Sequence, residues 1–299
     1  MPVTLAVVIP ATDDPPTLDR CLAAITAATD PPAEIIVVRT PWGAGPAEAR
    51  NTGTLKTDAD IVVFIDSDVV IQPDVFTRIR EAFALDDDLA AVFGSYDDLV
   101  ASGEIVAGFR NLLHHTVHQR SAGDVRSFWA GLGAVRRTVF DDVGGFDADR
   151  YPHPSIEDIE LGRRLGEKGR IVLDPELQGT HLKRWTLASM VRTDFSRRGV
   201  PWVALLVEQR GIPATLNLGA RERGSAVAAV AVAYGLVRRR PVVAAAGLLA
   251  GAVLNGDLVS LLYKRLGVRG AIAGVGLHIL HQLTAVAAVP VGVTMARRR

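Results

Sequence analysis

The sequence predicts an α/β fold over the first two thirds of the chain and a helical, apolar region after it. Short apolar runs rich in β-branched residues occupy residues 5–9, 34–38, 61–65 and 90–93. Helical patterns lie between them, at 17–28 and 74–85. This alternation of strand and helix is typical of a mainly parallel sheet flanked by helices, whose ligands bind beyond the carboxyl ends of the strands.

Charge is distributed unevenly along the 299 residues. The chain has 33 basic and 33 acidic side chains, yet from residue 225 onward nine charges are basic and only Asp257 is acidic, so the tail carries +8 and the first 224 residues −8. An acidic front joined to a basic, apolar tail excludes a uniform soluble domain and argues against nucleic-acid binding. The single cysteine, Cys21, excludes an intramolecular disulfide and a zinc site built from several thiolates.

The apolar tail predicts membrane association. Apolar stretches occupy residues 225–237, 241–263 and 271–295, and a crossing helix needs about 20 apolar residues. Arginine placement favours an interfacial or re-entrant first stretch followed by two crossings. The opening apolar run is too short for a secretory signal, so the α/β domain is expected on the cytoplasmic side of the cytoplasmic membrane. Buried helices of a soluble protein are the alternative.

These patterns divide the chain into three predicted parts. An α/β domain spans residues 1–205, a linker or interfacial helix spans 206–224, and membrane-associated helices in two or three segments span 225–299.

Two carboxylates follow the third predicted strand. Asp66 and Asp68 come directly after the apolar residues 61–65, separated by Ser67. Two carboxylates spaced in this way can converge on one Mg²⁺ or Mn²⁺ ion, which would neutralise a diphosphate. Acidic turn residues also commonly end strands, so a plain turn is the alternative.

A second acidic group begins a predicted helix near residue 157. Ser155 is an N-cap candidate, acids follow in the first turn, and Glu160 is spaced to pair with Arg164. Glu157 and Asp158 stand at the mouth of this helix after a loop rich in glycine and proline, where a carboxylate base can be presented to a substrate.

Several short motifs occur in order along the front of the chain. They are Val8-Ile9-Pro10, residues 34–38, Ala49-Arg50-Asn51-Thr52-Gly53, residues 60–68, Val143-Gly144-Gly145-Phe146-Asp147 and Glu157-Asp158. The ordered set resembles the family 2 glycosyltransferases of the GT-A fold over roughly residues 3–200. His181-Leu182-Lys183-Arg184-Trp185 is similar to the Q-x-x-R-W signature of membrane-bound members, with His in place of Gln.

The resemblance implies a role for each motif. Asp66 and Asp68 would hold Mg²⁺ or Mn²⁺ and the diphosphate of a nucleotide-sugar donor, and Asp158, beside Glu157, would be the base of an inverting transfer. The remaining implied positions are Pro10, Thr12, Asp13 and Asp14 at the nucleoside, Arg39, Arg50 and Asn51 elsewhere in the donor site, Arg184 and Trp185 on the acceptor side, and His181 at the metal. For Trp185 ordinary packing or interfacial anchoring, and for His181 a structural role, are the alternatives.

One segment departs from the family pattern. Where members often have an acidic pair followed by Gly-Ser, this chain has Arg39-Thr40-Pro41-Trp42-Gly43. Arg39 or Trp42 could contact the donor phosphate or stack on its base, although a plain turn explains the segment as well. The nucleotide of the donor is therefore left open.

The predicted function is a metal-dependent inverting transfer from a nucleotide sugar to an acceptor presented at the membrane, such as a lipid-linked glycan, a glycolipid or a polyprenyl phosphate. A related GT-A-like nucleotidyltransferase would usually begin with a Gly-rich phosphate-binding loop, and residues 11–16 contain no glycine. A catalytically silent membrane scaffold with the same fold is the other alternative. Retention of Asp66, Asp68 and Asp158 argues against it.

Overall fold

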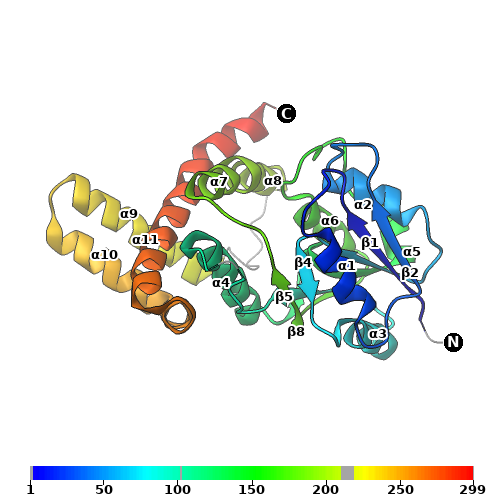
Figure 1. Ribbon diagram of the computed structural model, residues 1–299. Coiled ribbons are helices and arrows are strands. Elements are labelled where there is room, and N and C mark those ends of the chain that lie inside the picture. Colours follow the sequence, from blue (N-terminus) through cyan, green and yellow to red (C-terminus); the bar gives the residue numbers. More distant parts are fainter. Residues whose placement is uncertain (1–2, 102, 210–218, 299) are drawn as a thin grey trace. The chain divides into compact units, whose positions relative to one another are not determined.

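The computed structural model describes residues 3–101, 103–209 and 219–298, which form two compact units (Figure 1). The first contains residues 3–97 and 118–183, and the second contains residues 98–117 and the described part of 184–298. The structure therefore groups residues 184–205 with the C-terminal helices, whereas the sequence places them in the first domain. Residues 210–218 of the predicted linker lie outside the described residues.

A sheet of eight strands, counted over the described residues, forms the centre of the first unit. Its order is β2-β1-β3-β7-β5-β8-β4, with β6 paired to β8. The strands are β1 (Leu5–Pro10), β2 (Glu34–Val38), β3 (Ile61–Ile65), β4 (Val69–Ile71), β5 (Leu89–Tyr96), β6 (Gly123–Val125), β7 (Leu132–Arg136) and β8 (Arg170–His181). Strands β1, β2 and β3 are parallel, as are β5 and β8, while β7 runs antiparallel between β3 and β5. The predicted α/β class with a mainly parallel sheet is confirmed.

Alternating side chains of the central strands bury both faces of the sheet. Ile61, Val63 and Ile65 pack in the core with α1 (Leu18–Thr26) and α3 (Val75–Leu85). On the other face, Phe64 meets the rings of Phe140 and Phe146 at 5.6 and 5.2 Å between centroids. The other helices of the first unit are α2 (Pro46–Thr54), α5 (Arg137–Asp142) and α6 (Glu157–Leu165). Because both faces of β3 are buried, every residue of this strand is apolar.

The second unit is helical. Its elements are α4 (Ile105–Arg120, which begins in this unit), α7 (Leu187–Arg192), the π-helix η1 (Thr193–Gly199), α8 (Val200–Glu208), α9 (Ala220–Val237), α10 (Pro241–Leu254) and α11 (Gly256–Arg297). Phe109, Leu112, Met190, Leu258 and Leu262 form its buried core, so α4 and α7 pack with the first part of α11.

The apolar tail is more broken than the sequence suggests. The predicted crossing at 241–263 is not one helix, because α10 ends at Leu254, Asn255 caps it, and a new helix begins at Gly256. Gly267, with φ of 70°, then divides α11 into two helical parts. Among the described helices only α11 is long and apolar enough to cross a membrane.

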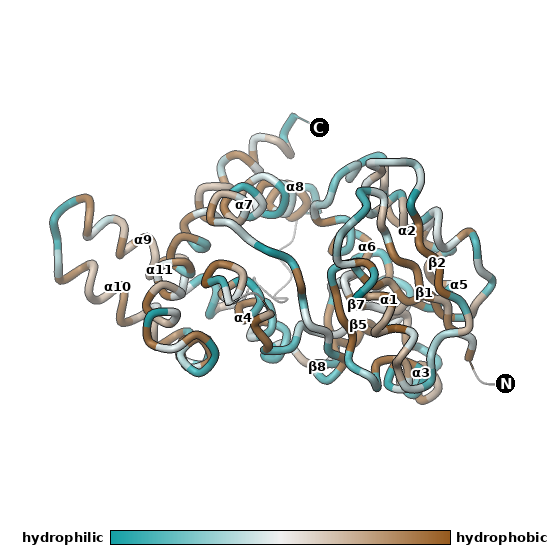
Figure 2. The backbone as a smooth tube through the Cα atoms, viewed as in Figure 1, coloured by the Kyte–Doolittle hydropathy of each residue, from teal (hydrophilic) through white to brown (hydrophobic). Residues whose placement is uncertain are grey.

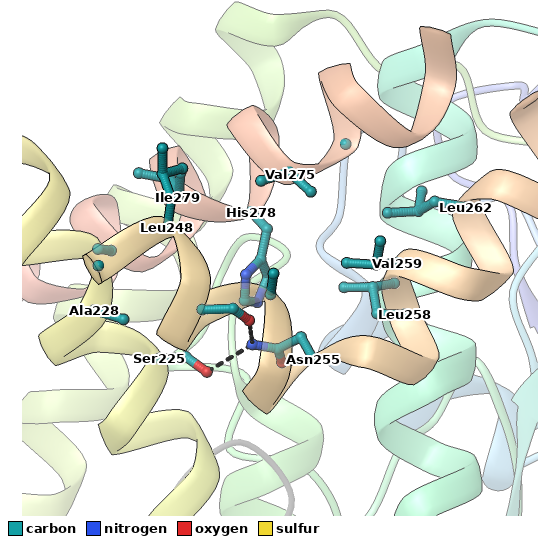
Figure 3. A pocket seen from close by; sticks show the side chains of 15 residues that line it. Ser225, Ala228, Leu248, Asn255, Leu258, Val259, Leu262, Val275, His278 and Ile279 are labelled. Carbon is teal, nitrogen blue, oxygen red and sulfur yellow. Dashed lines mark hydrogen bonds between the residues drawn. The ribbon is translucent and has the colours of Figure 1, made fainter. Parts of the chain in front are cut away.

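A small cavity lies between α9, α10 and α11 (Figure 3). Its walls are mostly aliphatic, and Ser225, Asn255 and His278 are polar side chains in its lining. The Asn255 amide donates to Ser225 Oγ and to the Gly251 carbonyl, both at 2.9 Å. The Gly251 carbonyl also accepts from the Asn255 backbone amide at 3.1 Å, so Asn255 closes the end of α10 with both its backbone and its side chain.

Candidate functional site

The carboxylates of Asp66 and Asp68 lie in a tight turn at the carboxyl end of β3. The Val69 amide donates to the Asp66 carbonyl at 3.0 Å, and the Asp66 amide donates to Gly131, next to the start of β7, at 3.0 Å. The Leu182 amide donates to the Asp68 carbonyl at 2.8 Å. Backbone contacts with Val69, Gly131 and Leu182 therefore fix the backbone of the turn from which both carboxylates project.

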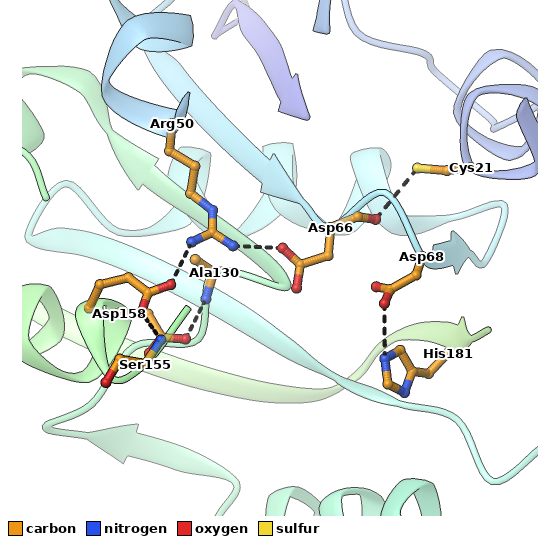
Figure 4. Close-up of polar contacts among 9 residues, drawn as sticks. Cys21, Arg50, Asp66, Asp68, Ala130, Ser155, Asp158 and His181 are labelled. Atoms are coloured by element: carbon orange, nitrogen blue, oxygen red, sulfur yellow. Dashed lines mark hydrogen bonds and ion pairs between the residues drawn. The ribbon is translucent and has the colours of Figure 1, made fainter. Parts of the chain in front are cut away.

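Arg50 of α2 joins this turn to the start of α6 (Figure 4). Its side chain is buried, and it donates to Asp66 Oδ1 at 2.6 Å and to Glu157 Oε1 at 3.3 Å. Its guanidinium also lies over the ring of Phe146, 5.4 Å from the centroid. Burial lowers the pKa of Arg50, but the charges of Asp66, Glu157 and Asp158 outweigh it and raise that pKa above its ordinary value. Arg50 therefore stays charged and compensates a cluster of acids.

Glu157 and Asp158 differ in their surroundings. Glu157 is buried and uses both oxygens, because Oε1 accepts from Arg50 and Oε2 accepts from the Ser155 amide at 2.8 Å. Asp158 is half-buried, its Oδ2 accepts from the Ala130 amide at 3.3 Å, and its Oδ1 accepts from the Ile159 amide at 2.8 Å. Asp158 is therefore the more exposed of the two carboxylates.

The predicted N-cap at Ser155 is wrong. Helix α6 begins at Glu157, its N-cap residue is Ile156, and no side chain caps it. Ser155 instead presents its backbone amide to Glu157, so the acid organises the loop before the helix. The predicted pair between Glu160 and Arg164 is confirmed, at 2.6 Å.

His181, the last residue of β8, lies beside Asp68. Nε2 of His181 is 3.5 Å from Asp68 Oδ2. The imidazole stacks on the ring of Tyr96 with centroids 4.2 Å apart, and Tyr96 meets Trp129 edge to face at 4.8 Å. Tyr96 and Trp129 were not predicted from the sequence, because neither belongs to a motif and only the pairing of β5 with β8 brings Tyr96 close to His181.

The ionisation of the two aspartates is coupled to this geometry. Burial raises the pKa of Asp66, Arg50 opposes that rise, and the neighbouring charge of Asp68 adds to it. Burial also raises the pKa of Asp68, but the hydrogen bond and charge of His181 outweigh it and lower that pKa. Two partly buried carboxylates that repel each other fit a divalent cation, which would relieve the repulsion.

The ligand types suit Mn²⁺ or Mg²⁺, but they do not form a closed cage. Over residues 3–101, 103–209 and 219–298, no three His, Cys, Asp or Glu side chains converge closely enough to hold a metal by themselves. Asp66, Asp68 and His181 lie at one end of the sheet, and a metal there would have room for ligands from a substrate.

The loops after β1 and β2 meet at the same edge. Thr12 Oγ1 donates to the Ala44 carbonyl at 2.6 Å, and the Gly43 amide donates to the Thr12 carbonyl at 2.9 Å. Exposed Arg39 and Asp14 pair at 3.4 Å. Pro10 ends β1, and Asp13 is exposed in the loop after it.

Asn51 has a structural contact. Its amide donates to the Phe146 carbonyl at 2.8 Å and its Oδ1 accepts from the Phe146 amide at 2.9 Å, so it clamps the loop that leads to α6. A role at the donor therefore has no support from its contacts, while this clamp links α2 to the loop before Glu157.

Arg184 and Trp185 belong to the second unit. Trp185 is buried there, and the Arg110 guanidinium lies over its ring at 5.1 Å. Their predicted position on the acceptor side stays a prediction.

Comparison with known proteins agrees with this architecture. Residues 13–144 match the family model "Glycosyl transferase family 2". This segment contains Asp14, Arg39, Arg50, Asn51, Asp66 and Asp68, whereas Asp158 and His181 lie beyond it.

Curated relatives resemble part of the chain. Two strains of Mycobacterium tuberculosis have a "Pre-mycofactocin glycosyltransferase" that is 31% identical over 166 residues, covering 53% of this chain. The match spans only 34% of the relatives' own length.

A solved structure resembles nearly the whole chain. The mannosyltransferase of Pyrobaculum calidifontis, determined with GDP-Man and Mn²⁺, superposes with a TM-score of 0.57 at 17% identity, covering 96% of this chain and 88% of that one. This likeness is one of fold. It shows the GT-A fold for this chain, and the similarity to glycosyl transferase family 2 lies in residues 13–144, which contain Asp66 and Asp68.

Proposed function

We propose that this protein is a metal-dependent inverting glycosyltransferase that moves a sugar from a nucleotide-sugar donor to an acceptor presented at a membrane. The observation that carries the proposal is the pair of contacts made by Arg50. By binding Asp66 and Glu157 at once, Arg50 ties the acids at the end of β3 to the helix that carries Asp158. In an inverting transfer the acceptor directly displaces the diphosphate from the sugar, so the residues that bind the donor and the base must be held at a fixed distance and orientation.

Asp158 is proposed as the base that accepts the proton of the acceptor hydroxyl. Its carboxylate is half-buried and is held by two backbone amides, whereas that of Glu157 is buried and paired with Arg50. General-base assistance of this kind is typically worth about 10²- to 10⁴-fold in rate. Glu157 is then a positioning residue that holds the start of α6 through Arg50 and Ser155.

Asp66, Asp68 and His181 are the residues that would hold Mg²⁺ or Mn²⁺, which supplies charge stabilisation to the departing diphosphate. Arg50 neutralises Asp66 and orients it, and Tyr96 holds the His181 ring in place by stacking. Loops at Thr12 and Arg39 border the same edge of the sheet and are proposed to contact the nucleoside.

The donor classes to try first are GDP- and UDP-sugars. The structural relative was determined with GDP-Man and Mn²⁺, which supports a guanosine donor as one candidate. An acceptor at the membrane is supported by α11, which is long and apolar enough to cross one. The acceptor is proposed to be a lipid-linked glycan, a glycolipid or a polyprenyl phosphate. The catalytic domain is proposed to lie on the cytoplasmic side of the membrane.

Calorimetric titration of the purified full chain tests the proposal. Each donor is titrated with Mn²⁺ and with a chelator, and product stereochemistry is then read by NMR for the donor that binds. Binding that requires metal, followed by inverted product, supports the proposal, whereas a retained configuration overturns inversion. Binding without transfer or hydrolysis would favour the silent scaffold, and release of pyrophosphate from a nucleoside triphosphate would favour the nucleotidyltransferase.

A further inference from the structure

The turn that joins α9 to α10 carries three consecutive arginines. Arg238, Arg239 and Arg240, called here the arginine turn, are all exposed. Within the residues that the structure describes, none of the three guanidinium groups has an acidic partner. The turn therefore presents a concentrated positive charge to its surroundings.

The arginine turn has a fixed backbone. The Arg240 amide donates to the Gly235 carbonyl at 2.7 Å, and the Arg238 amide donates to the Tyr234 carbonyl at 2.9 Å. Gly235 allows close contact of the two helices, since a Cβ there would lie 2.5 Å from the Ala244 nitrogen. Arg239 occupies the left-handed region, with φ of 52°, where glycine is the usual residue after a helix. The three charges are thus held close together by the hairpin.

Large apolar side chains surround these charges. Leu236, Val237 and Val242 are 68, 79 and 80% exposed, and with Val243 they form what is called here the apolar collar. Figure 2 shows a hydrophilic turn between two helices of mostly neutral to hydrophobic colour. Arginine beside exposed aliphatic residues fits the boundary between lipid headgroups and acyl chains, because each part meets its preferred surroundings there.

Helix length restricts where the turn can lie. Helix α10 has 14 residues, about 21 Å, and α9 has 18 residues with charged side chains at Arg221, Glu222 and Arg223 in its first turn. A hydrocarbon core is about 30 Å thick, so α10 does not reach across it. The hairpin is therefore suited to one leaflet.

We propose that the arginine turn binds the phosphates of anionic phospholipids in one leaflet, with the apolar collar among the upper acyl chains. The proposal rests on the membrane association in the proposed function and names the lipid class that this surface recognises. Charge complementarity selects anionic over zwitterionic headgroups, because basic residues gain energy near an anionic surface.

A fluorescent probe on the collar tests this in the full-length protein. The chain suits single-site labelling, since its one cysteine, Cys21, is buried and burial raises the pKa of its thiol to about 12. The variant Val237→Cys is labelled with an NBD maleimide and reconstituted in vesicles of phosphatidylcholine alone or with about 30 mol% phosphatidylglycerol. Acrylamide quenching measures exposure of the probe to water, and lipids with a nitroxide on the headgroup or at mid-chain measure its depth.

The expected result is a fall of about threefold or more in acrylamide quenching when phosphatidylglycerol is present, with stronger quenching by the headgroup nitroxide than by the mid-chain one. The triple variant R238Q/R239Q/R240Q should lose this dependence on anionic lipid. A control that removes three exposed arginines of the first unit, R20Q/R163Q/R170Q, should keep it. A probe at exposed Leu85 should remain open to acrylamide in both vesicles.

Equal acrylamide quenching in both vesicles, or an unchanged response in R238Q/R239Q/R240Q, overturns the proposal. Stronger quenching at mid-chain overturns the headgroup position. The readout uses neither donor nor acceptor, so it is independent of the proposed transfer. Loss of glycosyltransferase function would leave the quenching unchanged, and failure of the lipid contact would leave donor binding unchanged.

Discussion

The guanidinium of Arg50 lies between two carboxylates that are distant in sequence, donating to Asp66 at 2.6 Å and to Glu157 at 3.3 Å. Asp66 directly follows β3, and Glu157 starts the helix that carries Asp158. One buried cation therefore connects the turn proposed to bind the donor with the helix that carries the proposed base.

Removing this cation should leave two acids without their partner. Arg50→Met is expected to reduce the free energy of unfolding by about 3–5 kcal/mol, the usual cost of breaking a buried pair from one side. Denaturant unfolding in detergent measures the change, with the exposed Arg20→Met as the control.

The loss of unfolding free energy in Arg50→Met should also depend on pH. Burial already raises the pKa of Asp66 with Arg50 present, so ionised Asp66 costs stability as pH rises above the ordinary carboxyl range. Without Arg50 that cost grows, and the variant should be relatively more stable near pH 4 than at pH 7. A destabilisation that is equal at both pH values would contradict the role of Arg50 as counter-charge.

The acidic turn predicts metal-dependent donor binding. Asp68→Asn should abolish the increase in donor affinity that Mn²⁺ gives, while the melting temperature changes little, because Asp68 is near the surface and its backbone contacts remain. Calorimetry with and without Mn²⁺ measures this, and exposed Asp19→Asn is the matched control. Donor binding as tight as in the parent, in the presence of metal, would show that the assignment is wrong.

Asp60 offers a test of local electrostatics away from the site. Hydrogen bonds from the Thr4 amide and hydroxyl, at 2.9 and 2.7 Å, lower the pKa of Asp60. When folding lowers the pKa of a carboxyl group, the ionised group stabilises the folded protein at any pH above the unfolded-state pKa. This stability is lost as the pH falls through the lower, folded-state pKa. Because this pair is exposed, Asp60→Asn should cost about 0.5–1 kcal/mol at pH 7 after screening, and the difference from the parent should vanish once the pH falls below the lowered pKa of Asp60. A difference that persists in acid would contradict the charged hydrogen bond.

The sequence predicted β1, β2, β3 and β5 and did not predict β4, β6, β7 or β8. Strands β2 and β3 have the predicted bounds, because both are short runs rich in β-branched residues, and β3 is buried along its whole length. Strands β4 and β6 have three residues each and β7 is recognisable only through its pairing with β3 and β5, so periodicity alone does not reveal them.

The site was predictable by residue type and less so by contact. Asp66, Asp68 and Asp158 followed from strand ends and family motifs. The bridge through Arg50 and the stacking of Tyr96 on His181 depend on how α2, α6, β5 and β8 meet, which no local pattern encodes. Similarly, an apolar run indicated one crossing at 241–263, whereas Asn255 divides it.

Asp158 can reveal the chemistry of the acceptor. An alcohol has a pKa far above 7 and must lose a proton as the new bond forms, whereas a phosphate monoester has a second pKa near ~6 and is already largely ionised. If the acceptor is a sugar or lipid hydroxyl, Asp158→Asn should lower kcat by about 10²-fold or more. If it is a polyprenyl phosphate, the same change should act mainly through lost positioning and cost less, with little recovery at high pH.

We expect the hydroxyl outcome, because Asp158 is half-exposed at the start of α6 and its Oδ2 is oriented by the Ala130 amide. Steady-state kinetics on matched hydroxyl and phosphate acceptors distinguish the two cases, and Asp142→Asn on the exposed surface is the control. Product configuration should stay inverted in any residual activity, since the geometry of attack does not depend on the base. Near-full activity of Asp158→Asn on every acceptor would rule out the base assignment, and the search would then move to the other acids near Arg50, starting with Glu157.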